Sequence, residues 1–118
     1  MNVNFNFGIE RYKFEDAVNE LIKVINPKFL LVTLSEYGVF FKSAETSDLI
    51  PAHKRSISDV SGAGDTVISV ITLALLAGLD IKTASELANL SGGLVCEEIG
   101  VVPINKARLK KEAEQIKL

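Results

Sequence analysis

The heptapeptide Asp59-Val60-Ser61-Gly62-Ala63-Gly64-Asp65 is the most informative segment of this 118-residue chain. Its glycines can adopt positive φ and let the backbone approach a ligand closely. The residues that follow, Asp65 to Ala77, are apolar or small at nearly every position, which predicts a helix buried on most sides and ended by Gly78. The unpaired N–H groups of its first turn and the helix dipole would form an anion site suited to a phosphate.

Asp65 stands where that helix begins, within reach of a hydroxyl presented to a phosphate in the anion site. There it could act as a general base that removes the hydroxyl proton during phosphoryl transfer. An aspartate at a helix start is also a common cap, and a Gly-x-Gly pattern alone is weakly specific. Spacing by itself therefore leaves both interpretations open.

The segment before the heptapeptide predicts one helix and three strands. Phe14 to Ile25 repeats apolar residues at helical spacing and is stopped by Asn26-Pro27. Phe29 to Leu34 is a continuous apolar run, typical of a buried parallel strand. Val39 to Phe41 and Asp48 to Pro51 indicate two shorter strands near a sheet edge, because proline is confined to such positions.

Two further helices are predicted after Gly78, from Ile81 to Glu97 or Glu98 and from Asn105 to Lys117. We expect Glu97 and Glu98 to be exposed helix-end charges, and the charged run of the last helix to be a solvated face. The element order fits an α/β sandwich, but such a sheet needs more strands than this chain supplies. The chain is therefore expected to be one partial domain, residues 1–118, or to dock against a partner.

Composition excludes several classes of function. The net charge of −2 provides no electrostatic footprint for nucleic acid or an anionic membrane. No secretory leader is visible in residues 1–7, and the longest apolar stretch, Val67 to Leu79, is too short to span a bilayer, so we expect a cytoplasmic protein. Cys96 lies in an apolar helical stretch and is expected to be a buried hydrophobe, whereas His53 is expected at the surface.

The segment Asp59 to Thr66 is very similar to the second signature of the PfkB, or ribokinase-like, sugar kinases, and the resemblance runs over residues 29–118. It implies the C-terminal part of a three-layer α/β/α sandwich that binds ATP. It also implies that Asp65 is the catalytic base and that the amides of Gly62, Ala63 and Gly64 form the anion hole.

Two more segments resemble the nucleotide site of that family. Val32 to Val39 is similar to the strand and turn that lie against the nucleotide phosphates, which implies nucleotide-binding roles for Thr33, Ser35 and Gly38. The helix that carries Asn89 and Gly93 lines the adenine pocket in the family. Read from the residues alone, two adjacent glycines inside a helix cost about 1 kcal/mol each relative to alanine, and close helix packing explains them equally well.

The pair Ser35-Glu36, together with the extended heptapeptide, is most similar to the heptose-phosphate kinase branch, the kinase half of bifunctional ADP-heptose synthases. This implies a D-glycero-β-D-manno-heptose 7-phosphate 1-kinase for lipopolysaccharide core assembly, with ATP and a phosphorylated sugar as ligands. Two alternatives stay open: another PfkB-type sugar kinase, or a non-catalytic module that keeps the shape of the nucleotide site and acts by protein association.

The resemblance also bears on metal ions and on completeness. Some relatives hold a monovalent cation such as K⁺ beside the anion hole, which would make Asp59 and Ser61 ligands, although Ile104 stands where those relatives can offer a hydroxyl. The family's Asn-x-x-Glu motif for Mg²⁺ is not found ahead of Phe29. We therefore expect the chain alone to be inactive, and its apolar helix to be covered in a homo-oligomer.

Overall fold

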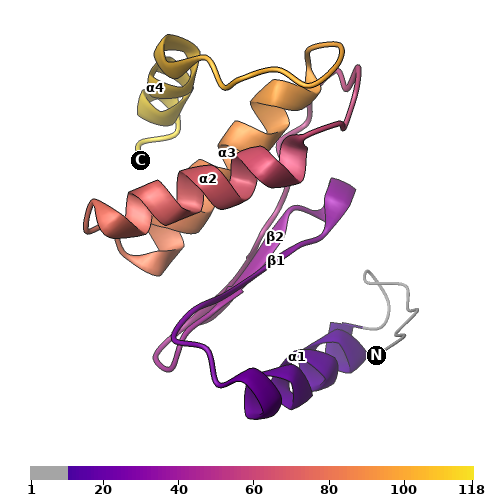
Figure 1. Ribbon diagram of the computed structural model, residues 1–118, viewed down its shortest axis with the longest axis vertical. Helices are drawn as coiled ribbons and strands as arrows, with labels where there is room; N and C mark the ends of the chain where they lie inside the picture. Colours follow the sequence, from indigo (N-terminus) through magenta and orange to yellow (C-terminus); the bar gives the residue numbers. More distant parts are fainter. Residues whose placement is uncertain (1–10) are drawn as a thin grey trace.

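The computed structural model describes residues 11–118 (Figure 1). Residues 1–7, where no secretory leader is visible in the sequence, lie outside the described residues. Helix α1 precedes a three-stranded sheet, and three helices follow it. In chain order the elements are α1 (Arg11–Ile25), β1 (Leu30–Thr33), a 3₁₀ turn (Ser35–Tyr37), β2 (Val39–Lys42), β3 (Ser47–Ile50), α2 (Ala63–Leu76), α3 (Ile81–Cys96) and α4 (Lys106–Gln115).

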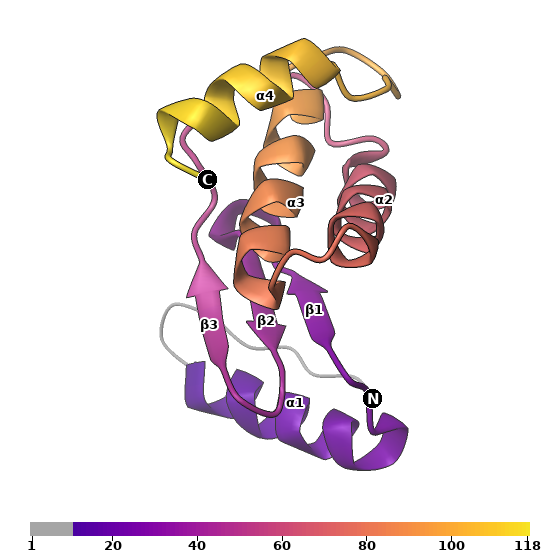
Figure 2. The ribbon, with the colours of Figure 1, turned by 90° about the vertical axis from the view of Figure 1, so that its left-hand side faces the viewer.

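The described elements form the three layers predicted from the sequence, with α1 on one face of the sheet and α2 and α3 on the other (Figure 2). Neighbouring residues of β2 serve the two faces, because successive strand side chains point in opposite directions. Phe40 packs edge-to-face on Phe14 of α1, with 5.1 Å between ring centroids. Phe41 is fully buried in the second core, with Val67 and Ile71 of α2.

The prediction of a parallel strand at Phe29 to Leu34 is wrong within the described sheet. Its order is β1-β2-β3 and both pairings are antiparallel, with Val32 opposite Phe40 and Phe40 opposite Leu49. The short link after β1 closes a hairpin, in which the Leu34 N–H donates to the Gly38 carbonyl at 2.8 Å. The apolar run reflects helices on both faces of the sheet rather than parallel neighbours.

The expectation that both shorter strands lie near an edge holds only for β3. The strand β2 is central among the three, and its residues Val39, Phe40 and Phe41 are all buried. Three consecutive apolar residues suit a central strand covered on both faces, whereas Pro51 directly follows the edge strand β3.

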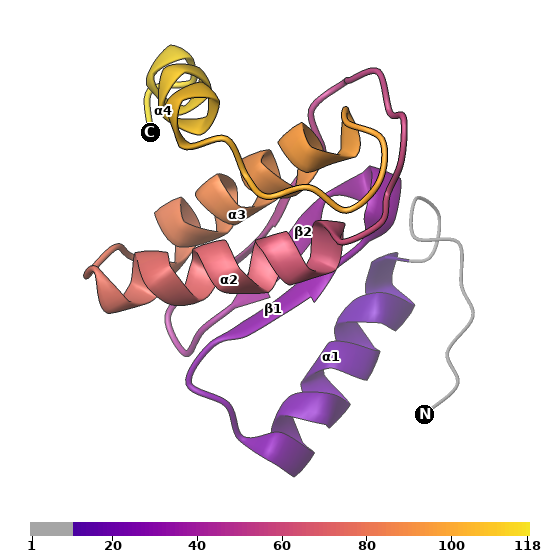
Figure 3. The ribbon, with the colours of Figure 1, turned by 45° about the horizontal axis from the view of Figure 1, so that its top comes forward.

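Helix α2 is less buried than its composition predicted. It lies beside α3 on the sheet (Figure 3) and buries only Val67, Ile71 and Ala74. By contrast, Ile68, Leu73 and Leu76 are 63%, 68% and 80% exposed. The helix has a single covered face because it lies at the side of its layer. Within residues 11–118 no helix is long and apolar enough to cross a membrane.

The expectation that Glu97 is an exposed helix-end charge is also wrong. Its side chain is 20% exposed and pairs with Arg55, which reaches it from the loop after β3, and with Arg108 of α4. The face of α4 that carries Arg108 and Glu112 therefore packs on other parts of the protein, while Lys110 and Lys111 are exposed as expected.

Candidate active site

The N-terminus of α2 offers unpaired backbone N–H groups. Gly62 adopts the left-handed conformation, with φ 78° and ψ 0°, and no side chain caps the helix. The first bond that closes a helical turn runs from the Thr66 N–H to the Gly62 carbonyl, at 3.1 Å. By contrast, side chains of Asp80 and Asn105 cap α3 and α4. The Ala63 N–H donates to the Val60 carbonyl at 3.3 Å, so the amides of Gly64 and Asp65 are the ones left for another acceptor.

The loop that leads to this helix is held by Asp59. Its Oδ1 accepts hydrogen bonds from the Ser61 N–H at 2.9 Å and the Ser61 hydroxyl at 2.7 Å, and its Oδ2 accepts from the Gly100 N–H at 3.0 Å. The hydroxyl of Ser61, followed by the backbone N–H groups of Ser61 and Gly100, lowers the pKa of Asp59. The Cys96 carbonyl accepts from the N–H groups of Ser58 and Asp59. The loop is therefore tied to the C-terminal end of α3 and to the loop that follows it.

A cleft of about 750 Å³ opens between the 3₁₀ turn, the loop before α2 and the helix α3. This volume lies within the usual range for small-molecule sites. Seven residues predicted to bind nucleotide or phosphate line it: Thr33, Ser35, Gly38, Ala63, Gly64, Asn89 and Gly93. The fold thus brings together three chain segments that sequence similarity had indicated separately.

The other predicted site residues lie around the loop rather than in the wall of the cleft. Asp65 is exposed in the first turn of α2, and Gly62 immediately precedes that helix. Asp59 and Ser61 bind each other, as described above. The proposed base is therefore accessible to a ligand above the start of α2, and the proposed anion-hole amides lie directly before it.

The structure gives Asn89 and the glycine pair packing roles as well. The Asn89 side chain is 8% exposed, and its Nδ2 donates to the Pro51 carbonyl at 3.0 Å. A Cβ added at Gly92 would lie 2.8 Å from Cγ2 of Val67, so this glycine lets α2 approach α3. A Cβ at Gly93 would instead lie 2.8 Å from Nε of Arg55.

Sequence reasoning missed the segment between β3 and the phosphate loop. His53, Lys54 and Arg55 all line the cleft, and His53 is exposed as expected. Cys96 is buried as expected, but it also lines the cleft, and burial followed by the charge of Asp59 raises the pKa of its thiol. No periodic pattern marks a loop arginine, so only three-dimensional proximity to Glu97 and Glu112 could have identified Arg55.

A metal site finds limited support in the donor groups. Among residues 11–118 no three His, Cys, Asp or Glu side chains are grouped so that they could hold a metal ion. Both carboxylate oxygens of Asp59 accept hydrogen bonds within the protein. A role for Asp59 and Ser61 as ligands of a monovalent cation stays a prediction.

The chain belongs to the pfkB family of carbohydrate kinases. The family model, described as "pfkB family carbohydrate kinase", matches residues 8–108. This match includes α1, the sheet, the phosphate loop, all of α3 and the start of α4, so it covers every residue of the candidate site.

Similar curated proteins share the name "Bifunctional protein HldE". The protein from Methylobacillus flagellatus is 42% identical over 83% of this chain and 20% of its own length. The one from Desulfatibacillum aliphaticivorans is 37% identical over 89% of this chain and 22% of its own length. The chain thus spans about a fifth of the length of these relatives.

Solved structures agree on the fold. Phosphofructokinase-2 from Escherichia coli, in complex with potassium, superimposes with a TM-score of 0.81 over 99% of this chain and 36% of its own, at 14% identity. Ribokinase from Thermotoga maritima gives 0.73 over 80% of this chain and 33% of its own, at 18% identity. The three-layer arrangement is therefore that of the ribokinase-like kinases.

Proposed function

We propose that this chain forms the nucleotide-binding and catalytic-base part of an ATP-dependent sugar kinase that phosphorylates the anomeric hydroxyl of a heptose 7-phosphate. The observation that carries the proposal is the start of α2, where uncapped amides after Gly62 adjoin Asp65 at one end of the cleft. The similarity to the HldE proteins favours the heptose branch of the pfkB family over other sugar kinases.

The residues that line the cleft fit a nucleoside triphosphate. The Gly64 amide precedes the first helical hydrogen bond, and a Cβ at Gly64 would meet nothing within 4 Å, so space for a phosphate exists in front of it. The neighbouring Ala63 N–H, which donates to the Val60 carbonyl at 3.3 Å, would have to exchange that bond for one to the phosphate. The helix dipole adds partial positive charge at the same place. The turn residues Thr33, Ser35 and Gly38 and the helix residues Asn89 and Gly93 would border the rest of the nucleotide in the cleft.

In the proposed reaction the chain supplies a base and an anion hole. ATP, when bound, supplies the phosphoryl group that is transferred. The Asp65 carboxylate takes the proton of the sugar hydroxyl as the hydroxyl oxygen attacks the γ-phosphorus, and the bond from that phosphorus to the oxygen bridging to the β-phosphate breaks, so that ADP leaves. The loop amides stabilise the negative charge that spreads over the phosphoryl oxygens. Among residues 11–118 no three His, Cys, Asp or Glu side chains are grouped so that they could hold the Mg²⁺ expected for such a kinase, so its ligands would come from other parts of a kinase domain or from the ATP phosphates.

We further propose that the 118 residues bind ATP but do not phosphorylate a sugar by themselves. The chain spans about a fifth of the length of its curated relatives, and Asp65 is the one residue assigned here that would touch the sugar. The remaining contacts to the sugar and the Mg²⁺ motif would then come from other parts of a kinase domain. Measurable phosphorylation of heptose 7-phosphate by the isolated chain would contradict this.

One alternative has a specific observation in its favour. The exposed apolar side chains of α2, which include Ile68, Leu73 and Leu76, are suited to protein association. A non-catalytic module that acts through this surface need not bind ATP. Calorimetric titration of the chain with ATP separates the two functions, because the kinase proposal requires saturable binding.

The assignment of Asp65 is best tested in a chimera. The 98 aligned residues of this chain would replace their counterpart in the M. flagellatus protein, to which they are 42% identical. In an active chimera, Asp65→Asn should retain ATP affinity while kcat falls by about 10²–10⁴-fold, the usual contribution of a general base. Thr72→Ala, an exposed change further along α2, is the matched control and should leave kcat unchanged. Near-normal turnover of Asp65→Asn would exclude Asp65 as the base.

A further inference from the structure

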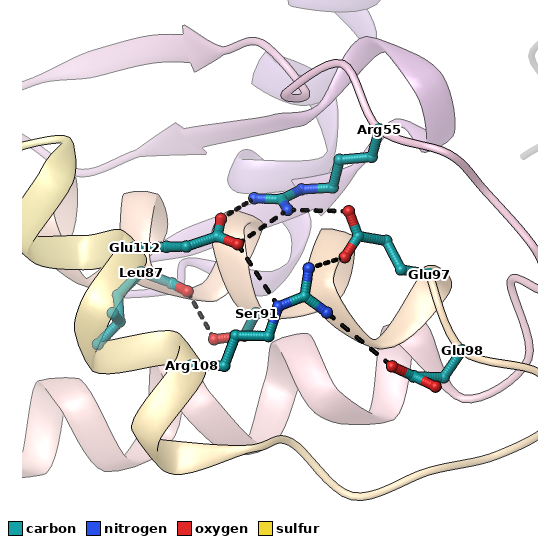
Figure 4. Close-up of polar contacts among 7 residues, drawn as sticks. All are labelled: Arg55, Leu87, Ser91, Glu97, Glu98, Arg108 and Glu112. Carbon is teal, nitrogen blue, oxygen red and sulfur yellow. Dashed lines mark hydrogen bonds and ion pairs between the residues drawn. The ribbon is translucent and has the colours of Figure 1, made fainter.

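A cluster of ion pairs joins three separate parts of the chain (Figure 4), and one of its members, Arg55, also lines the cleft. Arg55, from the loop between β3 and α2, pairs with Glu97 at the end of α3 at 3.3 Å and with Glu112 of α4 at 2.6 Å. Arg108 of α4 pairs with the second oxygen of Glu97 and lies 3.6 Å from Glu112. The two arginines thus share both carboxylates, and the loop and the two helices are held as one unit.

Arg55 is the buried member of this cluster. Its side chain is 8% exposed, against 39% for Arg108 and 20% and 24% for the two glutamates. Both terminal nitrogens of the guanidinium bind carboxylates, whereas its buried Nε has no hydrogen-bond partner among residues 11–118. Removing one partner of a buried ion pair leaves an uncompensated charge. The positions of Arg55, Glu97 and Glu112 therefore depend strongly on one another.

The stem of Arg55 lies against the floor of the cleft. Its Nε and Cδ occupy the space in front of Gly93, where an added Cβ would come within 2.8 Å and 3.1 Å of them. The guanidinium is fixed by its carboxylates, so these atoms cannot move aside freely. The lack of a side chain at Gly93 therefore leaves room for the Arg55 side chain to pack against α3. This explains why glycine, which is otherwise unfavourable inside a helix, stands at this position.

The same loop leads directly into the phosphate-binding segment. Three residues after Arg55, the N–H of Ser58 donates to the Cys96 carbonyl at 2.8 Å, and the N–H of Asp59 donates to it at 3.1 Å. Glu97, the partner of Arg55, is the next residue after Cys96. The ion pairs and the backbone bonds therefore fix the loop to the same end of α3 at two adjacent points.

We propose that Arg55 is a positioning residue for the nucleotide. Its side chain packs on Gly93 and pairs with Glu97 and Glu112, and these contacts hold the loop before α2 at the distance from α3 that the nucleotide cleft requires. The inference rests on the proposed ATP site and names the residue that sets its width. Arg55 acts through the loop and has no role in the chemistry itself.

The test compares ATP affinity and folding in variants of the 118-residue chain. Arg55→Gln and Glu112→Gln should each raise the Kd for ATP by about tenfold, a typical size for residues coupled through shared contacts. The control Arg11→Gln removes an exposed ion pair of α1 with Glu15 and should leave the Kd unchanged. Titrations would be made at a temperature at which circular dichroism shows each variant to be folded, and Glu112→Gln serves where Arg55→Gln does not fold.

The possible outcomes separate this inference from the proposed function. A wild-type chain that fails to bind ATP overturns both. Wild-type binding with an unchanged Kd in folded Arg55→Gln and Glu112→Gln, even with a lowered Tm, overturns the positioning role alone, because a merely stabilising cluster would affect only unfolding.

A double-mutant cycle tests the packing of Arg55 on Gly93. Gly93→Ala should weaken ATP binding in the wild-type background by displacing Arg55, but should have little further effect in an Arg55→Ala background, where the added methyl has room. Equal losses of ATP affinity in both backgrounds would mean that Gly93 contacts the nucleotide independently of Arg55. That result would overturn the proposed packing role of Gly93.

Discussion

The carboxylate of Asp59 accepts a hydrogen bond from the backbone N–H of Gly100 at 3.0 Å, across 41 positions of sequence. This bond joins the start of the phosphate loop to the loop between α3 and α4. Gly100 has φ +80°, a conformation that glycine adopts without strain, and its neighbour Val101 touches the space in front of Gly62. The two loops therefore support each other where the proposed anion hole is formed.

We expect the stabilisation from Asp59 to depend on pH. The Ser61 hydroxyl and the N–H groups of Ser61 and Gly100 lower the pKa of Asp59 below its unfolded value. The charged form is thus favoured in the folded protein, and its contribution is present at neutral pH. The contribution is lost as the pH falls from about 3.9, the ordinary pKa of an aspartate, through the lowered pKa of Asp59 in the folded protein. Thermal melts of wild type and Asp59→Asn from pH 7 to pH 3 should show a Tm difference that narrows with acidity; a constant difference would contradict this.

Much of the fold follows from local sequence, whereas the exceptions depend on distant contacts. Helical periodicity predicted α1 and α3, and the phosphate-loop segment predicted where α2 begins to within two residues, at Ala63 instead of Asp65. The direction of β1 could not be predicted, because the helices that cover both faces of the sheet produce the same apolar run in either direction. Arg55 and Glu97 each look like ordinary surface charges until folding brings them together.

The glycines at the site should separate packing from ligand binding. A Cβ at Gly92 would lie 2.8 Å from Cγ2 of Val67, so Gly92→Ala should destabilise the protein by about 1–3 kcal/mol through overpacking of α2 on α3. At Gly64 nothing lies within 4 Å of an added Cβ, and Gly64→Ala should keep or raise stability, by up to about 1 kcal/mol. Urea unfolding of both variants measures the contrast, and equal losses would show that the packing at Gly92 does not decide its identity.

Gly64 should matter for the nucleotide even though it does not matter for packing. Gly64→Val places a branched side chain in the open space before the α2 amides, so we expect a folded protein that binds ATP about tenfold or more weakly, because crowding a packed contact typically costs about 1–3 kcal/mol. Calorimetric titration would measure it, with the exposed Thr72→Ala as control. An unchanged Kd in folded Gly64→Val would show that Gly62 to Gly64 is only a structural turn.

The exposed side of α2 should make the isolated chain associate. Ile68, Leu73 and Leu76 are 63–80% exposed, and they lie on a helix whose other face already covers the sheet. Contiguous apolar patches of several hundred Å² are rare on soluble monomers, so we expect dimers or larger species. Light scattering of Leu73→Glu should then give a smaller mass than wild type, whereas Lys110→Glu, on the exposed side of α4, should not. A wild-type chain that stays monomeric over a wide concentration range would contradict the expectation, because the apolar side of α2 would then be stable in water without a partner.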